Sequence, residues 1–139
     1  MSPEEKNTWV YLALAIILPA VYASSVLPQL QGTPVADIDY AGRLLTAIGA
    51  AIVISIVANI VLTIFSGAKP QKLDERDRSI AARSDLVGYW VLSVGIIGVL
   101  FLVFARADQF WIGNGIYAAF IVSAVVSTII KLVAYRRGF

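Results

Sequence analysis

The sequence predicts an all-α protein, an integral membrane four-helix transmembrane bundle that forms one domain over residues 1–139. Its composition is 59% hydrophobic and 14% charged, whereas soluble domains are about 45–50% apolar and about 25% charged. Four apolar segments of 19 to 22 residues follow one another. None alternates polar and apolar residues as a barrel strand does, so the spans are expected to be helical.

Each apolar segment is long enough to cross a membrane. About 20 helical residues at 1.5 Å each cover a hydrocarbon core about 30 Å thick. The segments are residues 9–27, 44–65, 86–105 and 110–130. The first also allows a signal-peptide interpretation, because Val21-Tyr22-Ala23 resembles a cleavage site. Its leader is net acidic, however, and signal peptides begin with basic residues, so we expect a retained span.

The basic residues predict the orientation. With four spans, nine of the eleven Lys and Arg residues fall on the side of the two termini and the second connection. The other two, Arg43 and Arg106, fall on the opposite side. By the positive-inside rule the nine-residue side is cytoplasmic. We therefore expect a multi-pass protein of the cell's inner (plasma) membrane, with cytoplasmic termini and a cytoplasmic charged segment at 67–85.

Small and polar residues recur along the spans. The second span has a four-residue repeat of Ala47, Ala51, Ser55, Asn59 and Thr63, and the fourth has Gly115, Ala119, Ser123, Ser127 and Lys131. The third carries Ser84, Gly88, Gly95 and Gly98 close to one face. Such stripes favour close helix packing in membranes, within a chain or between copies. The alternative is a polar path formed by Asn59, Thr63, Ser123, Ser127 and Lys131.

The second connection concentrates charge. Nine of the twenty charged residues lie between Lys69 and Asp85. We expect a helix from Leu73 that runs into the third span, with acidic residues in its first turn, where the helix dipole favours them. Glu75 and Arg78 have the spacing of an ion pair. The side that carries Ile80 and Val87 is suited to rest on the membrane surface or on a partner.

Three interpretations of this segment stay open. It is a solvated extension that sets topology, or an interaction surface, or a metal or phosphate site. The interaction surface docks another protein or holds the carboxyl tail, through Asp74, Glu75, Arg76, Asp77, Arg78 and Arg83. Against a metal site, three acidic residues within four helical positions spread around the helix and do not converge on one ion.

A short pattern in this region resembles a known family. Asp74-Glu75-Arg76-Asp77 is followed by Ile80, Arg83-Ser84 and Gly88-Tyr89-Trp90. The pattern is similar to that of a family of small membrane proteins from bacteria and archaea, whose function is uncharacterised. Those proteins have about four spans and an Asp-Glu-Arg-Glu/Asp element before a later span. The resemblance implies a small microbial membrane protein and supplies no catalytic residue.

The composition also limits function. The chain has neither Cys nor His, so thiol chemistry and the commonest general base and metal ligand are absent. We expect no enzyme, catalytic residue, cofactor or metal, and a net charge of +2 does not indicate a nucleic-acid binder. The main hypothesis is an accessory or regulatory subunit that contacts lipid and either another membrane protein or a second copy. The alternative is a small homo-oligomeric transporter or channel, although no ionisable group lies near a span centre.

Overall fold

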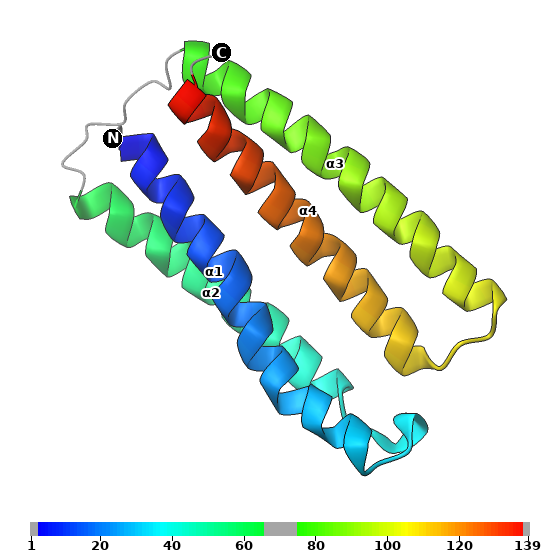
Figure 1. The fold of residues 1–139 in the computed structure, drawn as a ribbon. Helices are drawn as coiled ribbons and strands as arrows, with labels where there is room; N and C mark the ends of the chain where they lie inside the picture. The colour runs from blue at the N-terminus through cyan, green and yellow to red at the C-terminus, as the bar shows by residue number, and fades with distance from the viewer. Residues whose placement is uncertain (1–2, 66–74, 138–139) are drawn as a thin grey trace.

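The computed structural model describes residues 3–65 and 75–137, which form an all-helical fold (Figure 1). The long helices are α1 (Pro3–Val26), α2 (Ala41–Phe65), α3 (Glu75–Phe104) and α4 (Gln109–Arg137). Two short 3₁₀ helices, η1 (Leu27–Gln31) and η2 (Val35–Asp37), lie between α1 and α2. All four long helices are long and apolar enough to cross a membrane. The expected all-α fold with four helices able to span a membrane is thereby confirmed, and the placement of the termini in the cytoplasm stays a prediction.

The expected spans coincide with these helices except at Leu27 and Ala105, each one residue past a helix end, and α3 extends furthest beyond its span. The third span continues the charged segment without a break, since α3 begins at Glu75 and not near Leu86. The helix thus projects about 16 Å beyond its apolar part, at 1.5 Å per residue. Leu73 and Asp74 lie outside the described residues.

The turn between α3 and α4 has recognisable caps at both sides. Arg106 adopts a left-handed φ of 53°, and the Ala107 amide donates to the Leu102 carbonyl at 3.0 Å. These features end α3 as a Schellman-type cap. The Asp108 carboxylate then accepts a bond from the Phe110 amide at 2.9 Å and caps α4. The tight turn makes α3 and α4 an antiparallel pair.

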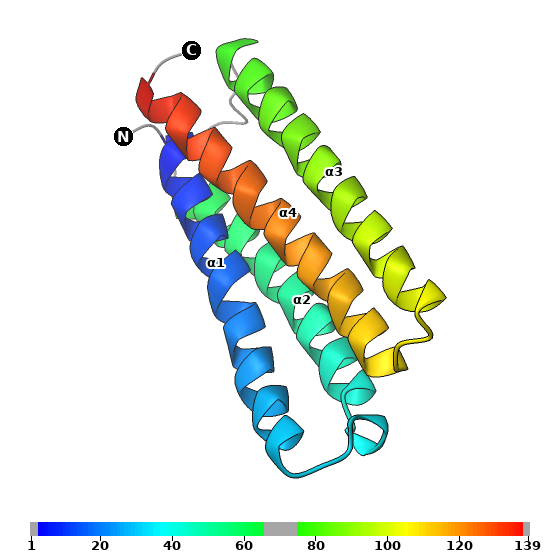
Figure 2. The same ribbon diagram turned by 45° about the vertical axis from the view of Figure 1, so that its right-hand side comes forward.

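The four helices do not form a closed square. Helix α4 is central and packs against both α3 and α1, while α2 packs against α1 (Figures 1 and 2). In the described part of the chain, α3 makes no comparable contact with α1 or α2. The start of α1, the end of α2, the start of α3 and the end of α4 lie at the same end of the molecule (Figure 1).

One cluster of buried residues lies at the other end, beside the connection between α1 and α2. Its centre is Tyr22, Val26, Ile38 and Phe110. The Tyr22 hydroxyl donates to Asn114 Oδ1 at 2.6 Å, and the Tyr22 ring meets Tyr117 edge to face. Residues of η1 and η2 cover this cluster. This cluster therefore joins α1, α4 and the start of α2.

Candidate functional site

The α3–α4 interface accounts for the small residues of the third and fourth spans. A Cβ added at Gly95 would lie 2.7 Å from the Ala119 Cβ, and one at Gly88 would lie 3.0 Å from the Ser127 Cβ. The Ser123 hydroxyl donates to the Gly88 carbonyl at 2.7 Å. Close packing of these two stripes is confirmed. Gly98 is the exception, because a Cβ there would meet nothing within 4 Å.

This packing directs the polar residues of α4 away from those of α2. Ser123 bonds the α3 backbone, and the Ser127 hydroxyl lies 3.4 Å from Asp85 Oδ1. Lys131 is half-buried, whereas Asn59 and Thr63 are exposed on α2. Among the described residues no hydrogen bond joins the two groups. The structure therefore does not bring the five path residues together in one chain, and the path stays a prediction.

The start of α3 is seated on α4 by one apolar side. Ile80 and Ser84 are 4% and 1% exposed and share a cavity of about 310 Å³ with Ile130 and Ala134. The side that was expected to rest on the membrane surface or on a partner is thus covered mainly by α4, although Val87 at its edge is exposed. The sequence periodicity identified the buried side correctly but not what covers it.

The charged residues of this segment lie around the remaining surface. Glu75, Arg76, Arg78 and Arg83 are exposed and Asp77 is half-buried. The expected Glu75–Arg78 pair does not form, since Arg136–Glu5 is the ion pair found in the described ranges. In residues 3–65 and 75–137, no cluster of three or more carboxylates could hold a metal ion. Asp74 was a candidate both for the metal or phosphate site and for the contact surface. It lies outside the described residues.

The carboxyl end of α4 is held by neighbouring helices at the same end of the molecule. Arg136 Nε lies 3.5 Å from Glu5 Oε1, and its guanidinium sits 5.5 Å from the centre of the Trp9 ring. Tyr135 lies beyond the apolar segment 110–130. Burial, together with the carboxylates of Asp77 and Glu4, raises the pKa of Tyr135 to about 12, so the phenol stays protonated. Composition alone did not reveal this cluster.

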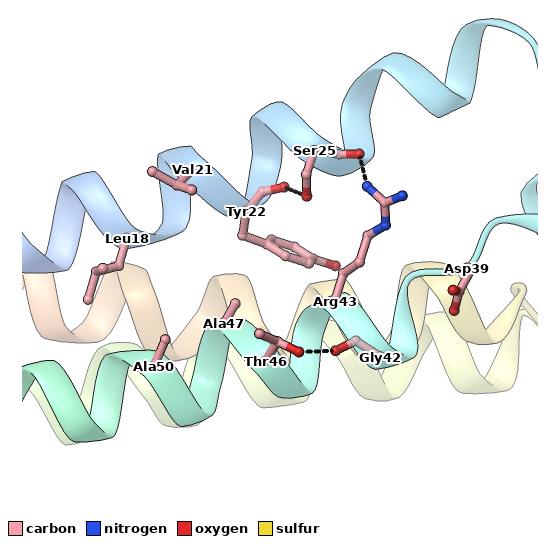
Figure 3. Close-up of a pocket in the computed structure, with 10 residues that line it drawn as sticks. All are labelled: Leu18, Val21, Tyr22, Ser25, Asp39, Gly42, Arg43, Thr46, Ala47 and Ala50. Atoms are coloured by element: carbon pink, nitrogen blue, oxygen red, sulfur yellow. Dashed lines mark hydrogen bonds between the residues drawn. The ribbon is translucent and has the colours of Figure 1, made fainter.

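A crevice of about 430 Å³ lies between α1 and α2 near the core (Figure 3). The Arg43 guanidinium donates to the Ser25 carbonyl at 2.9 Å across it (Figure 3). Gln29 Nε2 donates to the same carbonyl at 3.1 Å. The last carbonyls of an α-helix lack helical partners, so these side chains satisfy the end of α1. Arg43, which the sequence assigned only to topology, also joins two helices.

A second groove, of about 840 Å³, separates α2 from α4 and is almost entirely apolar. Helix α2 contributes Leu44, Ile48, Ala51, Ile52, Ser55 and Ile56 to it. No residue of α2 is buried. Of the four helices, α2 is therefore the least covered by the rest of the chain.

Comparisons with protein-family models, curated proteins and solved structures give no match. The resemblance carried by Asp74 to Trp90 stays a prediction.

Proposed function

We propose that this chain is a non-enzymatic integral membrane protein, an accessory or regulatory subunit that contacts a partner membrane protein through the start of α3. The described residues of the contact surface are the exposed Glu75, Arg76, Arg78 and Arg83 and the half-buried Asp77. The observation that carries the proposal is that the Glu75, Arg78 and Arg83 side chains form no ion pair or hydrogen bond with any described residue. Their charges are available for an intermolecular contact.

The rest of the fold supports this surface by holding it rigid. Ile80 and Ser84 fix the segment against α4, and the close Gly88–Ser123 approach continues the contact into the apolar part. A surface that is already ordered loses little conformational entropy when it binds.

The proposed orientation places this surface in the cytoplasm of the cell, beneath the inner (plasma) membrane. The support is the distribution of basic residues, nine of eleven on the side of the termini. The start of α1 and the end of α4 lie together at the end where α3 begins (Figure 1), which is the arrangement that an even number of spans requires.

A double charge reversal tests the contact surface. We expect Arg78→Glu with Arg83→Glu to remove a different protein from the complex that native mass spectrometry detects in gently extracted membranes. Arg106→Glu, the same kind of change at the opposite end of α3, is the control and should leave the complex intact. All variants should insert in the same orientation, because at least seven basic residues remain on the side of the termini against at most two on the other.

Two results would contradict the proposal. One is a complex that persists unchanged in the double variant. The other is a wild-type protein found only as a closed ring of identical copies, which would favour the transporter or channel alternative. The serine hydroxyls of α4 give that alternative no support within one chain, because they are directed at α3.

A further inference from the structure

The outward side of α2 carries a heptad pattern. Leu45, Ile52 and Asn59 occupy one position of the repeat, and Gly49, Ile56 and Thr63 follow each of them by four residues. This spacing puts Gly49, Ile56 and Thr63 at the a positions of a left-handed coiled coil, and Leu45, Ile52 and Asn59 at its d positions. All six residues are exposed, with Leu45 at 71%, Ile52 at 57% and Ile56 at 55%. We call these six residues the α2 seam.

Asn59 is the unusual member of the seam. It lies six residues inside the end of the apolar segment 44–65, which is about 9 Å along a helix. Its Oδ1 accepts a long contact from the Thr63 hydroxyl at 3.5 Å. Its amide N–H groups donate to no described residue. A polar group without a hydrogen-bond partner is costly where no water competes.

We infer that a second copy of this chain covers the α2 seam, so that two α2 helices pack in parallel about a twofold axis. Copies of a membrane protein insert with the same orientation, so a twofold along the membrane normal places each seam residue opposite itself. A carboxamide both donates and accepts, so Asn59 is complementary to Asn59 of the partner subunit.

The surroundings of the seam suit a helix. Gly49 offers a close approach, because a Cβ there would meet nothing within 4 Å. Helix α2 packs against α1 and lies between α1 and α4 in the view of Figure 2. Ile52 and Ile56 also line the mouth of the groove toward α4, so a second helix seated there would fill part of it. Lipid chains alone would cover the apolar side chains but leave the Asn59 donors without acceptors.

This inference goes beyond the proposed function and does not depend on it. The contact surface on α3 projects from the end of the molecule, whereas the α2 seam runs along the apolar length of another helix. If the chain does not self-associate, binding of a partner through α3 is still tested separately by the charge reversals at Arg78 and Arg83.

Disulfide cross-linking in native membranes tests the inference, because the chain has no cysteine of its own. Single variants Ile52→Cys and Ile56→Cys introduce thiols on the seam. Val53→Cys and Val57→Cys are matched controls at the same depth but on another side of α2, where the valines are 59% and 51% exposed. Under mild oxidation we expect covalent dimers from the seam variants and little from the controls.

A second variant tests whether Asn59 stabilises the dimer. Asn59→Leu should lower the dimer association constant by about threefold to thirtyfold, the range for one interhelical polar hydrogen bond in membranes. Asn59→Gln, which keeps the amide, should retain more of the dimer. Folding is checked by cross-linking across the α3–α4 pair, which is remote from the seam.

The inference is overturned if the seam and control cysteines cross-link equally or not at all. It is also overturned if the Ile56→Cys thiol reacts only with a different protein, or if Asn59→Leu leaves the dimer fraction unchanged. A monomer with bound lipid at this groove would identify lipid as the occupant instead.

Discussion

Single small residues decide how closely the central helices pack. At Gly95 the α3 backbone approaches Ala119 so closely that a Cβ would lie 2.7 Å from the Ala119 Cβ. Real side chains do not tolerate this separation, so the helices would have to move apart. Since the Ser123–Gly88 bond depends on the same approach, one glycine supports both the packing and a hydrogen bond.

The first prediction concerns this glycine. Gly95→Leu should destabilise the protein by about 1–3 kcal/mol, the usual cost of overpacking a tight interface. Gly98→Leu on the same helix is the control, because a Cβ there meets nothing within 4 Å. Unfolding of the purified proteins in micelles with increasing denaturing detergent measures the difference. Equal stability of the two variants would mean that the α3–α4 approach is looser than described.

At the scale of elements, the helices differ in what holds them. Helices α3 and α4 share a continuous interface, α1 is tied to α4 at both ends, and α2 is attached near its start. The attachment of α1 at the charged end depends on Arg136, which meets both Glu5 and Trp9. The Glu5 side chain is 12% exposed and that of Arg136 is 63% exposed, so solvent screens only part of this contact.

The second prediction concerns this attachment. Arg136→Ala should speed amide hydrogen exchange in the last turn of α4 and the first turns of α1 while leaving the α3–α4 centre unchanged. The change should be small, within about 1 kcal/mol, because partly exposed ion pairs contribute little. Arg137→Ala removes a neighbouring charge and serves as the control. Unchanged exchange at both ends would show that Arg136 does not secure them.

At the scale of the whole molecule, the arrangement of charge and apolar length implies a direction across the membrane. The connection with η1 and η2 lies at one end and the start of α3 lies at the other (Figure 1). A membrane that encloses the apolar lengths separates these two ends. The proposed orientation places the start of α3 in the cytoplasm and the η2 region outside.

The third prediction tests this direction. In intact cells a membrane-impermeant maleimide should label Ala36→Cys in η2, and it should label Ser79→Cys in α3 only after permeabilisation. Both positions are exposed, so a difference in labelling reports the side and not burial. Labelling of Ser79→Cys in intact cells would reverse the proposed orientation.

Much of the fold could be predicted from local sequence. Apolar length alone located the four spans, and the run of helix-forming residues after Leu73 indicated that α3 begins before its apolar part. The glycines and serines of the third and fourth spans indicated a close pair. The charged residues of the proposed contact surface could also be predicted, because Arg78 and Arg83 lie in a polar stretch of the sequence however the helices pack.

Other features could not be predicted, because they depend on which faces meet. The stripe on α2 looked like that on α4, yet Ser123 turns toward α3 while Asn59 stays exposed. Arg136 pairs with Glu5 near the opposite end of the sequence, and no local sequence pattern predicts such a contact. The periodicity of Ile80 and Val87 indicated an apolar side but not that α4 lies against most of it.

By itself, the sequence determined the number, length and helical character of the apolar segments, because these follow from hydrophobicity and helix rise along a continuous stretch. Only the tertiary structure decided that α4 is central, that α3 packs mainly against α4, and that no residue of α2 is buried. The physical reason is that lipid is as apolar as the helix surfaces. Hydrophobicity therefore does not determine which helices pack together. The close fit of small residues and a few hydrogen bonds between helices determine it.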